Sequence, residues 1–93
     1  MREHEIEKKV CQYVESYGGA ALKLRCEGRN GFPDRTVILP NGKVIFIEFK
    51  TQNGRLRSAQ QKCIDDLHSL RQEVYVVRSA QDGYDLIDKL IGV

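Results

Sequence analysis

The 93-residue sequence has no long apolar run, only two prolines and three cysteines, and few aromatic side chains. No run approaches the roughly 18 apolar residues that a membrane span needs. The charged start, with Arg2, Glu3, Glu5 and Glu7, argues against a signal peptide. Since 41% of the residues are hydrophobic and 30% are charged, the composition is that of a globular protein. We therefore expect neither a membrane protein nor a secreted one.

Cys11, Cys26 and Cys63 lie far apart, and no Cys-x-x-Cys pair occurs. An odd, scattered set of cysteines argues against a disulfide framework and against a structural zinc site. We expect reduced thiols in an intracellular, cytoplasmic protein. The two histidines, His4 and His68, fall on helical patterns without a serine or cysteine partner, so the sequence indicates no nucleophile–base pair.

Basic residues are concentrated in the middle of the chain, although the net charge is only +2. Residues 23–62 carry a net charge of +6, while residues 1–22 carry −1 and residues 63–93 carry −3. A basic middle suits a phosphate-backbone partner. A solvated surface rich in lysine and arginine fits the charge alone equally well. Because only 8% of the residues are aromatic, base stacking is not expected to be the main source of binding.

Apolar spacing predicts a single α/β domain over residues 1–93 with the element order αβββαβα. Helices are expected at residues 3–17, from Ser58 onward, and at residues 80–91. Strands are expected at residues 20–26, 36–39, 44–49 and 74–77. In the second helix we expect a capping box at residues 58–61, with Ile64, Leu67 and Leu70 facing inward. Both faces of the hairpin formed by the second and third strands are largely apolar, so we expect both to be covered.

Carboxylates within strands are the most informative feature. Glu48 interrupts the apolar run of residues 44–49, where an ionised carboxylate is costly unless it is paired or bound to a cation. Lys50 lies two residues further on, hence on the same face, and Asp34 follows Pro33 at the start of the preceding strand. Two carboxylates beside a lysine suit Mg²⁺ or Mn²⁺. A half-exposed Glu48–Lys50 ion pair is the alternative interpretation.

The turn between these two strands decides whether Asp34 and Glu48 share a face. A two-residue Asn41-Gly42 turn would pair Arg35 with Glu48 and separate the carboxylates. A three-residue loop, Pro40-Asn41-Gly42, pairs Leu39 with Lys43 and therefore Asp34 with Glu48. We predict the three-residue loop, because proline, asparagine and glycine suit its three successive conformations.

The ordered set of Gly31-Phe32-Pro33-Asp34-Arg35, Gly42, Ile47-Glu48-Phe49-Lys50, Gly54, Gln60 and residues 74–77 resembles the VRR-NUC family of the PD-(D/E)xK superfamily, the virus-type replication-repair nucleases. The resemblance implies a restriction-endonuclease-like core, with a mixed central sheet flanked by helices. It also implies a Mg²⁺- or Mn²⁺-dependent deoxyribonuclease, bacterial or phage-encoded. Relatives usually have a glycine at the end of the second helix, where this chain reads Leu70-Arg71-Gln72-Glu73.

The resemblance also implies roles for individual residues. Asp34, Glu48 and the backbone carbonyl of Phe49 would hold the metal, Lys50 would orient or activate a water, and Gln60 would bond to the site. For the glutamate that the family has in its first helix, Glu3, Glu5 and Glu7 compete. We choose Glu7, which shares a side with Val10, Cys11 and Val14. The expected DNA contacts are Arg29, Arg35, Arg55, Arg57 and Lys62.

Family members made of this domain alone resemble homodimeric resolvases of four-way (Holliday) junctions, enzymes of DNA repair. The resemblance therefore implies branched or duplex DNA as the partner, and a homodimer. The alternative is a non-catalytic DNA-binding module that retains the nuclease fold. An intact Asp34, Glu48 and Lys50 favours the enzyme.

Overall fold

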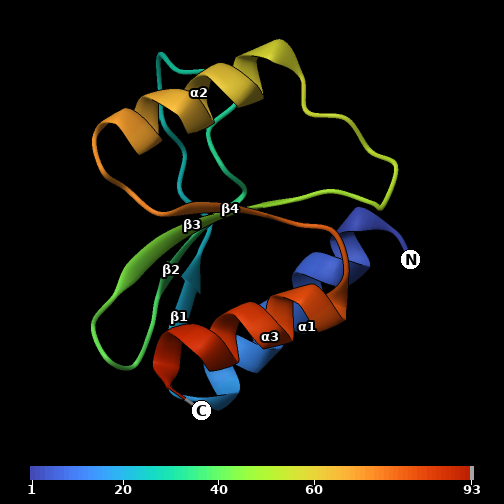
Figure 1. The fold of residues 1–93 in the computed structure, drawn as a ribbon, viewed down its shortest axis with the longest axis vertical. Helices are drawn as coiled ribbons and strands as arrows, with labels where there is room; N and C mark the ends of the chain where they lie inside the picture. The colour runs from blue at the N-terminus through green and yellow to red at the C-terminus, as the bar shows by residue number, and fades with distance from the viewer. Residues whose placement is uncertain (93) are drawn as a thin grey trace.

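The computed structural model describes residues 1–92, which form three helices and one four-stranded sheet (Figure 1). The helices are α1 (Glu3–Ser16), α2 (Ser58–Ser69) and α3 (Ala80–Ile91). The strands are β1 (Ala20–Leu22), β2 (Arg35–Ile38), β3 (Val44–Phe49) and β4 (Val74–Val77). The element order αβββαβα is the predicted one. None of the helices in the described part of the chain is long and apolar enough to cross a membrane.

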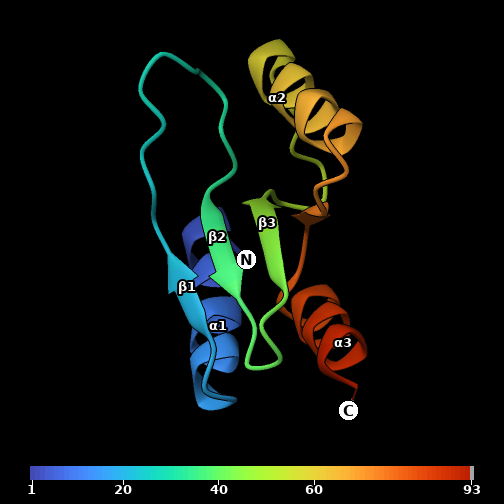
Figure 2. The same ribbon diagram turned by 90° about the vertical axis from the view of Figure 1, so that its left-hand side faces the viewer.

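The sheet has the order β1-β2-β3-β4, in which β2 is antiparallel to both β1 and β3, while β3 is parallel to β4. Helix α2 connects the two parallel strands and lies on one side of the sheet, while α1 and α3 lie together on the other (Figure 1). The long connection from β1 to β2 extends past the sheet to the level of α2 (Figure 2). A mixed sheet between helices, as the resemblance implied, is therefore confirmed.

The predicted three-residue hairpin loop is also confirmed. Val37 pairs with Ile45 and Arg35 with Ile47, which sets Leu39 opposite Lys43. Gly42 donates its N–H to the carbonyl of Leu39 at 2.8 Å and has a φ of +89°, the left-handed conformation that glycine adopts readily. Continued by one residue, this register sets Asp34 opposite Glu48.

The apolar core lies between the sheet and the pair α1 and α3. Alternate residues of β2 and β3, together with the residues that extend them, supply its sheet side: Val37, Leu39, Ile45, Ile47 and Phe49, each at most 2% exposed. Where the two helices cross, Gly83 of α3 lies against Val10 of α1, and a Cβ on Gly83 would come within 2.4 Å of a Val10 methyl carbon. The glycine thus allows the two helices to approach closely.

Three local predictions are wrong. The first strand ends at Leu22, because β2 begins at Arg35 and offers no partner to residues 24–26. Leu70 is 67% exposed, because α2 ends one residue before it. The hairpin is covered on only one face at its turn end, where Ile38 and Val44 are 39% and 43% exposed.

The end of α2 forms without the glycine that the family resemblance implied there. Arg71 takes the left-handed conformation, with φ +62°. The N–H groups of Arg71 and Gln72 donate to the carbonyls of His68 and Leu67, both at 2.9 Å, as in a Schellman motif. The helix end therefore keeps the geometry that a glycine provides, with a non-glycine residue in a strained conformation.

Candidate active site

Glu48 is the centre of the site, at the end of β3 and on the side of the sheet that faces α2. Only 2% of it is exposed. Burial, with the neighbouring Asp34 carboxylate as the next cause, raises the pKa of Glu48 to about 8, although Lys50 opposes the shift. Its Oε2 accepts a hydrogen bond from Gln60, whereas its Oε1 is buried and has no hydrogen-bond partner within residues 1–92.

Asp34 stands beside Glu48, directly before β2. Its Oδ2 accepts the N–H of Phe49 at 2.8 Å, so it is fastened to the strand that carries Glu48. Thr36, two residues further along β2 and so on the same face, has a buried hydroxyl that also lacks a partner within residues 1–92. Two buried polar atoms without partners on one face are costly to the folded protein.

Lys50 follows β3 and is 8% exposed. Its N–H donates to the carbonyl of Val77 at 3.0 Å, which continues the pairing of β3 with β4 and fixes the backbone at the site. The ion pairs within residues 1–92 join other basic residues, Arg29, Arg35, Lys43 and Lys62. The Glu48–Lys50 ion pair considered from the sequence is therefore not formed, and Lys50 acts on Glu48 through its charge.

Gln60 reaches the site from the first turn of α2. Its Nε2 donates to Glu48 Oε2 at 2.9 Å, and its Oε1 accepts the N–H of Arg57 at 2.8 Å. The same amide therefore caps the helix and holds the carboxylate. The predicted capping box at residues 58–61 is wrong by one position, because the capping glutamine is Gln60 rather than Gln61.

Glu7 is not part of this cluster, and neither is Arg35. Glu7 Oε2 accepts a hydrogen bond from Arg35 Nε at 2.6 Å, and Arg35 also donates to the carbonyl of Ala21 at 2.9 Å. These bonds join α1 to the edge of the sheet, on the face opposite Glu48. The roles of Glu7 as a metal ligand and of Arg35 as a DNA contact stay predictions, and in this structure each side chain is engaged by the other.

Glu3, the first residue of α1, is the glutamate of that helix whose charge raises the pKa of Glu48. The helical stripe that favoured Glu7 identifies the side of α1 that packs on the core. It carries no information about which end of the helix lies near the carboxylates.

Four of the expected DNA contacts lie on exposed side chains around α2. Arg55 and Arg57 stand in the loop before the helix, Lys62 on its outer side, and Arg29 in the loop between β1 and β2. The loop before α2 is fixed by Arg78, a residue not identified from the sequence, which donates to the carbonyls of Thr51 at 2.9 Å and Gly54 at 2.6 Å. The sequence feature that could have identified Arg78 is its position directly after β4, the parallel neighbour of β3.

The donor atoms fit a hard divalent cation, which favours oxygen ligands. The free Oε1 of buried Glu48, a carboxylate oxygen of Asp34 and the carbonyl of Phe49 are of the required type. No group of three or more His, Cys, Asp or Glu side chains suited to a metal ion occurs among residues 1–92. A cation here would therefore depend on two carboxylates, a backbone carbonyl and water.

Comparison with known proteins places this geometry in a family. The model of the VRR-NUC domain family matches residues 2–81. The protein named "Putative nuclease p44" of Acyrthosiphon pisum secondary endosymbiont phage 1 is 40% identical over 79 residues, which cover 85% of each chain.

Two solved structures are similar over nearly the whole chain. A structure named "VRR_NUC domain" has a TM-score of 0.80 at 34% identity and covers 97% of this chain and 94% of its own. A "VRR_NUC domain protein" has a TM-score of 0.79 at 16% identity over 99% and 89%, a likeness of fold alone. Together with the family match over residues 2–81, these findings show that the chain belongs to the VRR-NUC family of nuclease domains.

Proposed function

We propose that this protein is a metal-dependent DNA endonuclease that hydrolyses phosphodiester bonds. The observation that carries the proposal is the buried Glu48, whose Oε1 lacks a partner within residues 1–92 and which lies beside Asp34 and Lys50. Keeping a carboxylate protonated, or uncompensated, in a buried position destabilises the fold. Binding of a divalent metal ion explains why the protein keeps this buried carboxylate.

Asp34, Glu48 and the carbonyl of Phe49 would hold Mg²⁺ or Mn²⁺. When bound, the ion lowers the pKa of water and neutralises charge on the scissile phosphate. Gln60 keeps Glu48 Oε2 engaged, so that Oε1 is the oxygen left for the ion. The hydrogen bond from the Phe49 N–H to Asp34 keeps this second carboxylate on the same side of the sheet as Glu48. Glu3 is close enough to influence the site by its charge and is the candidate for a third acidic group.

Lys50 would orient the attacking water and offset the negative charge that develops on the phosphate. Its ammonium is not held in an ion pair within residues 1–92, so it is free to bind an anion. Its backbone is fixed by pairing with β4, which limits its movement. Pre-positioned charge of this kind requires little reorganisation when the reaction occurs.

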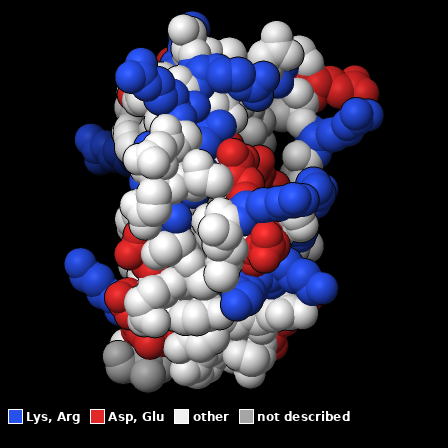
Figure 3. Space-filling view, turned by 90° about the vertical axis from the view of Figure 1, so that its right-hand side faces the viewer, with Lys and Arg blue, Asp and Glu red and all other residues white. Residues whose placement is uncertain are grey.

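DNA would be bound through its backbone by Arg55, Arg57, Arg29 and Lys62, which gives affinity without sequence readout. Figure 3 shows lysine and arginine side chains gathered over the upper part of one face, with acidic groups among them. The mixture of signs favours moderate affinity that falls with salt.

We propose further that the enzyme is intracellular, acts on four-way junctions and works as a homodimer. A two-fold dimer presents two sites to the opposed strands of a symmetric junction. The same face of the sheet carries exposed apolar side chains on β1, β2 and β3 (Leu22, Ile38 and Val44), which a second copy would cover. Light scattering of the wild type and of Val44→Glu tests this: the variant should be monomeric, and a monomeric wild type would contradict the dimer.

Supercoiled plasmid incubated with the protein tests the nuclease activity. Nicked and linear products should form with Mg²⁺ or Mn²⁺ and should not form with EDTA. A four-way junction should then be cut faster than duplex, flap or single-stranded DNA. Binding of DNA without cleavage in any metal would instead support the non-catalytic DNA-binding module.

A further inference from the structure

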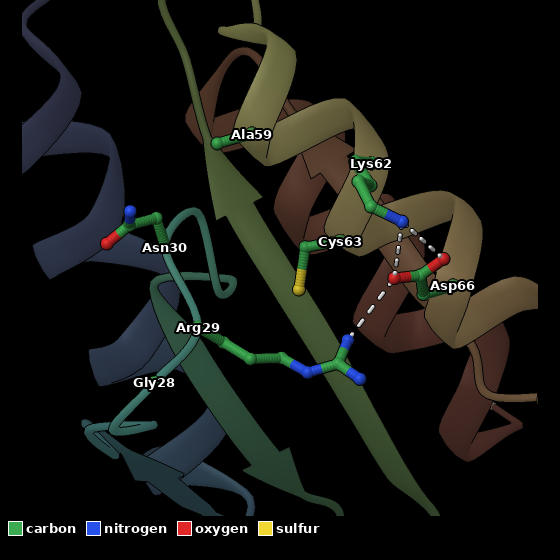
Figure 4. Close-up of a pocket in the computed structure, with 7 residues that line it drawn as sticks. All are labelled: Gly28, Arg29, Asn30, Ala59, Lys62, Cys63 and Asp66. Atoms are coloured by element: carbon green, nitrogen blue, oxygen red, sulfur yellow. Dashed lines mark hydrogen bonds and ion pairs between the residues drawn. The ribbon is translucent and has the colours of Figure 1, made fainter.

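A concave surface lies between α2 and the loop that joins β1 to β2. It has a volume of about 390 Å³ and is formed by a loop on one side and the helix on the other (Figure 4): Gly28, Arg29, Asn30, Ala59, Lys62, Cys63 and Asp66. We call it the α2 pocket. The loop is seated firmly, because a Cβ on Gly31 would come within 2.5 Å of the backbone of Ala59.

One carboxylate in the α2 pocket binds two cations. Asp66 Oδ2 lies 3.3 Å from Arg29 Nη1 and 3.3 Å from Lys62 Nζ, as the dashed lines in Figure 4 mark. The arginine comes from the loop and the lysine from the helix, so the carboxylate joins two separate elements. The arginine and lysine side chains are 53% and 77% exposed, and exposed ion pairs of this kind contribute little to stability.

A phosphodiester could take the place of this carboxylate. It has the same single negative charge and two non-bridging oxygens, and arginine and lysine are its usual partners. Because the existing ion pairs are weak, exchanging Asp66 for a phosphate costs the protein little. The side chains that hold Asp66 would then bind the phosphate.

The α2 pocket and the active site adjoin the same helix. Gln60 of α2 bonds to Glu48, while Lys62 and Asp66 face the pocket. A helix is about 10 Å across with its side chains, and nucleotides in one DNA strand rise about 3.4 Å each. A strand with its scissile phosphate at Glu48 would therefore pass the α2 pocket within a few nucleotides.

We propose that the α2 pocket is a subsite for a backbone phosphate of nucleic acid, and that Asp66 is a built-in competitor for it. The subsite rests on the proposed nuclease function and adds to it a specific contact and its regulation. In the free protein Asp66 holds Arg29 and Lys62. On binding, the phosphate displaces Asp66, so the carboxylate lowers the affinity of the protein for DNA.

Asp66→Asn and Asp65→Asn form a matched pair for the test. Both remove one negative charge from the same turn of α2, but Asp65 is exposed and accepts a hydrogen bond from Gln61, outside the pocket. Binding of a short DNA duplex is measured in EDTA, which prevents cleavage. We expect Asp66→Asn to bind about threefold more tightly than Asp65→Asn, with a steeper salt dependence. Adding Arg29→Ala to Asp66→Asn should remove the gain and lower the salt slope by about one.

Three results would overturn the subsite. Equal affinities of the two asparagine variants would mean that only net charge matters. Weaker binding by Asp66→Asn than by the wild type would mean that Asp66 merely holds the loop in place. If inorganic phosphate at millimolar concentration competes for the pocket as effectively as DNA does, the pocket is a site for small anions. Plasmid cleavage by the wild type separates these results from failure of the nuclease proposal, which would show as the absence of cleavage in any metal.

Discussion

The face of the sheet against α1 and α3 is apolar and closed, whereas the face toward α2 carries charged groups and is partly open. The first buries side chains that are at most 2% exposed. The second buries Glu48 and Thr36 with polar atoms that lack partners within residues 1–92. Burial of apolar area stabilises the fold, and burial of unpaired polar atoms costs stability. One face therefore maintains the structure while the other is organised for binding.

Changing Lys50 should produce the largest loss of activity. Lys50→Ala should slow plasmid cleavage by at least about 100-fold, because it removes a charge placed for the transition state. Binding of DNA should change little, since one phosphate contact among several is lost. Lys43→Ala is the control, because Lys43 lies on the same hairpin but pairs with Glu73. Equal loss of DNA binding and of cleavage in Lys50→Ala would contradict this division.

Replacing Glu48 should make the protein more stable and inactive. The pKa of Glu48 is raised from 4.5 to about 8, so the folded state binds more protons than the unfolded state between these values, and stability falls as pH rises through this window. The free energy of unfolding of Glu48→Gln should thus be roughly 2 kcal/mol higher than that of the wild type at pH 8. This gain in stability should shrink toward pH 4.5.

Urea denaturation at several pH values measures this gain. Glu73→Gln is the matched control, because Lys43 lowers the pKa of Glu73 and its removal should not stabilise the protein at pH 8. A Glu48→Gln variant less stable than the wild type at pH 8 would show that Glu48 does not cost the fold stability.

On the apolar face, adding a single methyl group should lower stability and leave activity unchanged. Gly83→Ala would place a Cβ within 2.4 Å of a Val10 methyl carbon, so α1 and α3 must separate. We expect a loss of about 1–3 kcal/mol in the free energy of unfolding, with metal binding and cleavage retained below the melting temperature. Gln81→Ala, an exposed position of α3, is the control. Unchanged stability of Gly83→Ala would show that the helix crossing is not tightly packed.

The smallest expected effect concerns the end of α2. Arg71→Gly should raise the free energy of unfolding by about 1 kcal/mol, because glycine adopts the left-handed conformation without strain. Arg71→Ala keeps the strained backbone and should show no such gain. Thermal unfolding of both variants distinguishes relief of backbone strain from loss of the arginine side chain. Equal stabilisation in the two would mean that the side chain is responsible.

Local chemistry was enough to predict most of the fold and the centre of the site. The turn sequence Pro40-Asn41-Gly42 fixed the register that sets Asp34 opposite Glu48, since one residue more or less reverses the face of every side chain. The lysine two residues beyond Glu48 followed from the same alternation. These relations depend only on neighbours in the chain and on the preferences of individual residues.

What could not be predicted depends on how distant elements meet. Helical periodicity predicts the buried side of α1 but not which of its acidic residues, Glu3, Glu5 or Glu7, faces the carboxylates. Nothing local shows that Arg35 of β2 would bind Glu7 of α1. The length of β1 depends on where its partner strand begins, and the pairing of Asp66 with Arg29 depends on the path of a loop.

Calorimetric titration of Mn²⁺ into the wild type and Asp34→Asn at pH 7.5 tests the central claim most directly. Asp65→Asn, which removes the same charge elsewhere, is the control. If Asp34 and Glu48 hold the ion together, the wild type and Asp65→Asn should bind one Mn²⁺ per chain, and Asp34→Asn should bind at least about tenfold more weakly. Equal affinity of all three proteins, or no binding by the wild type, would contradict a metal site between the two carboxylates.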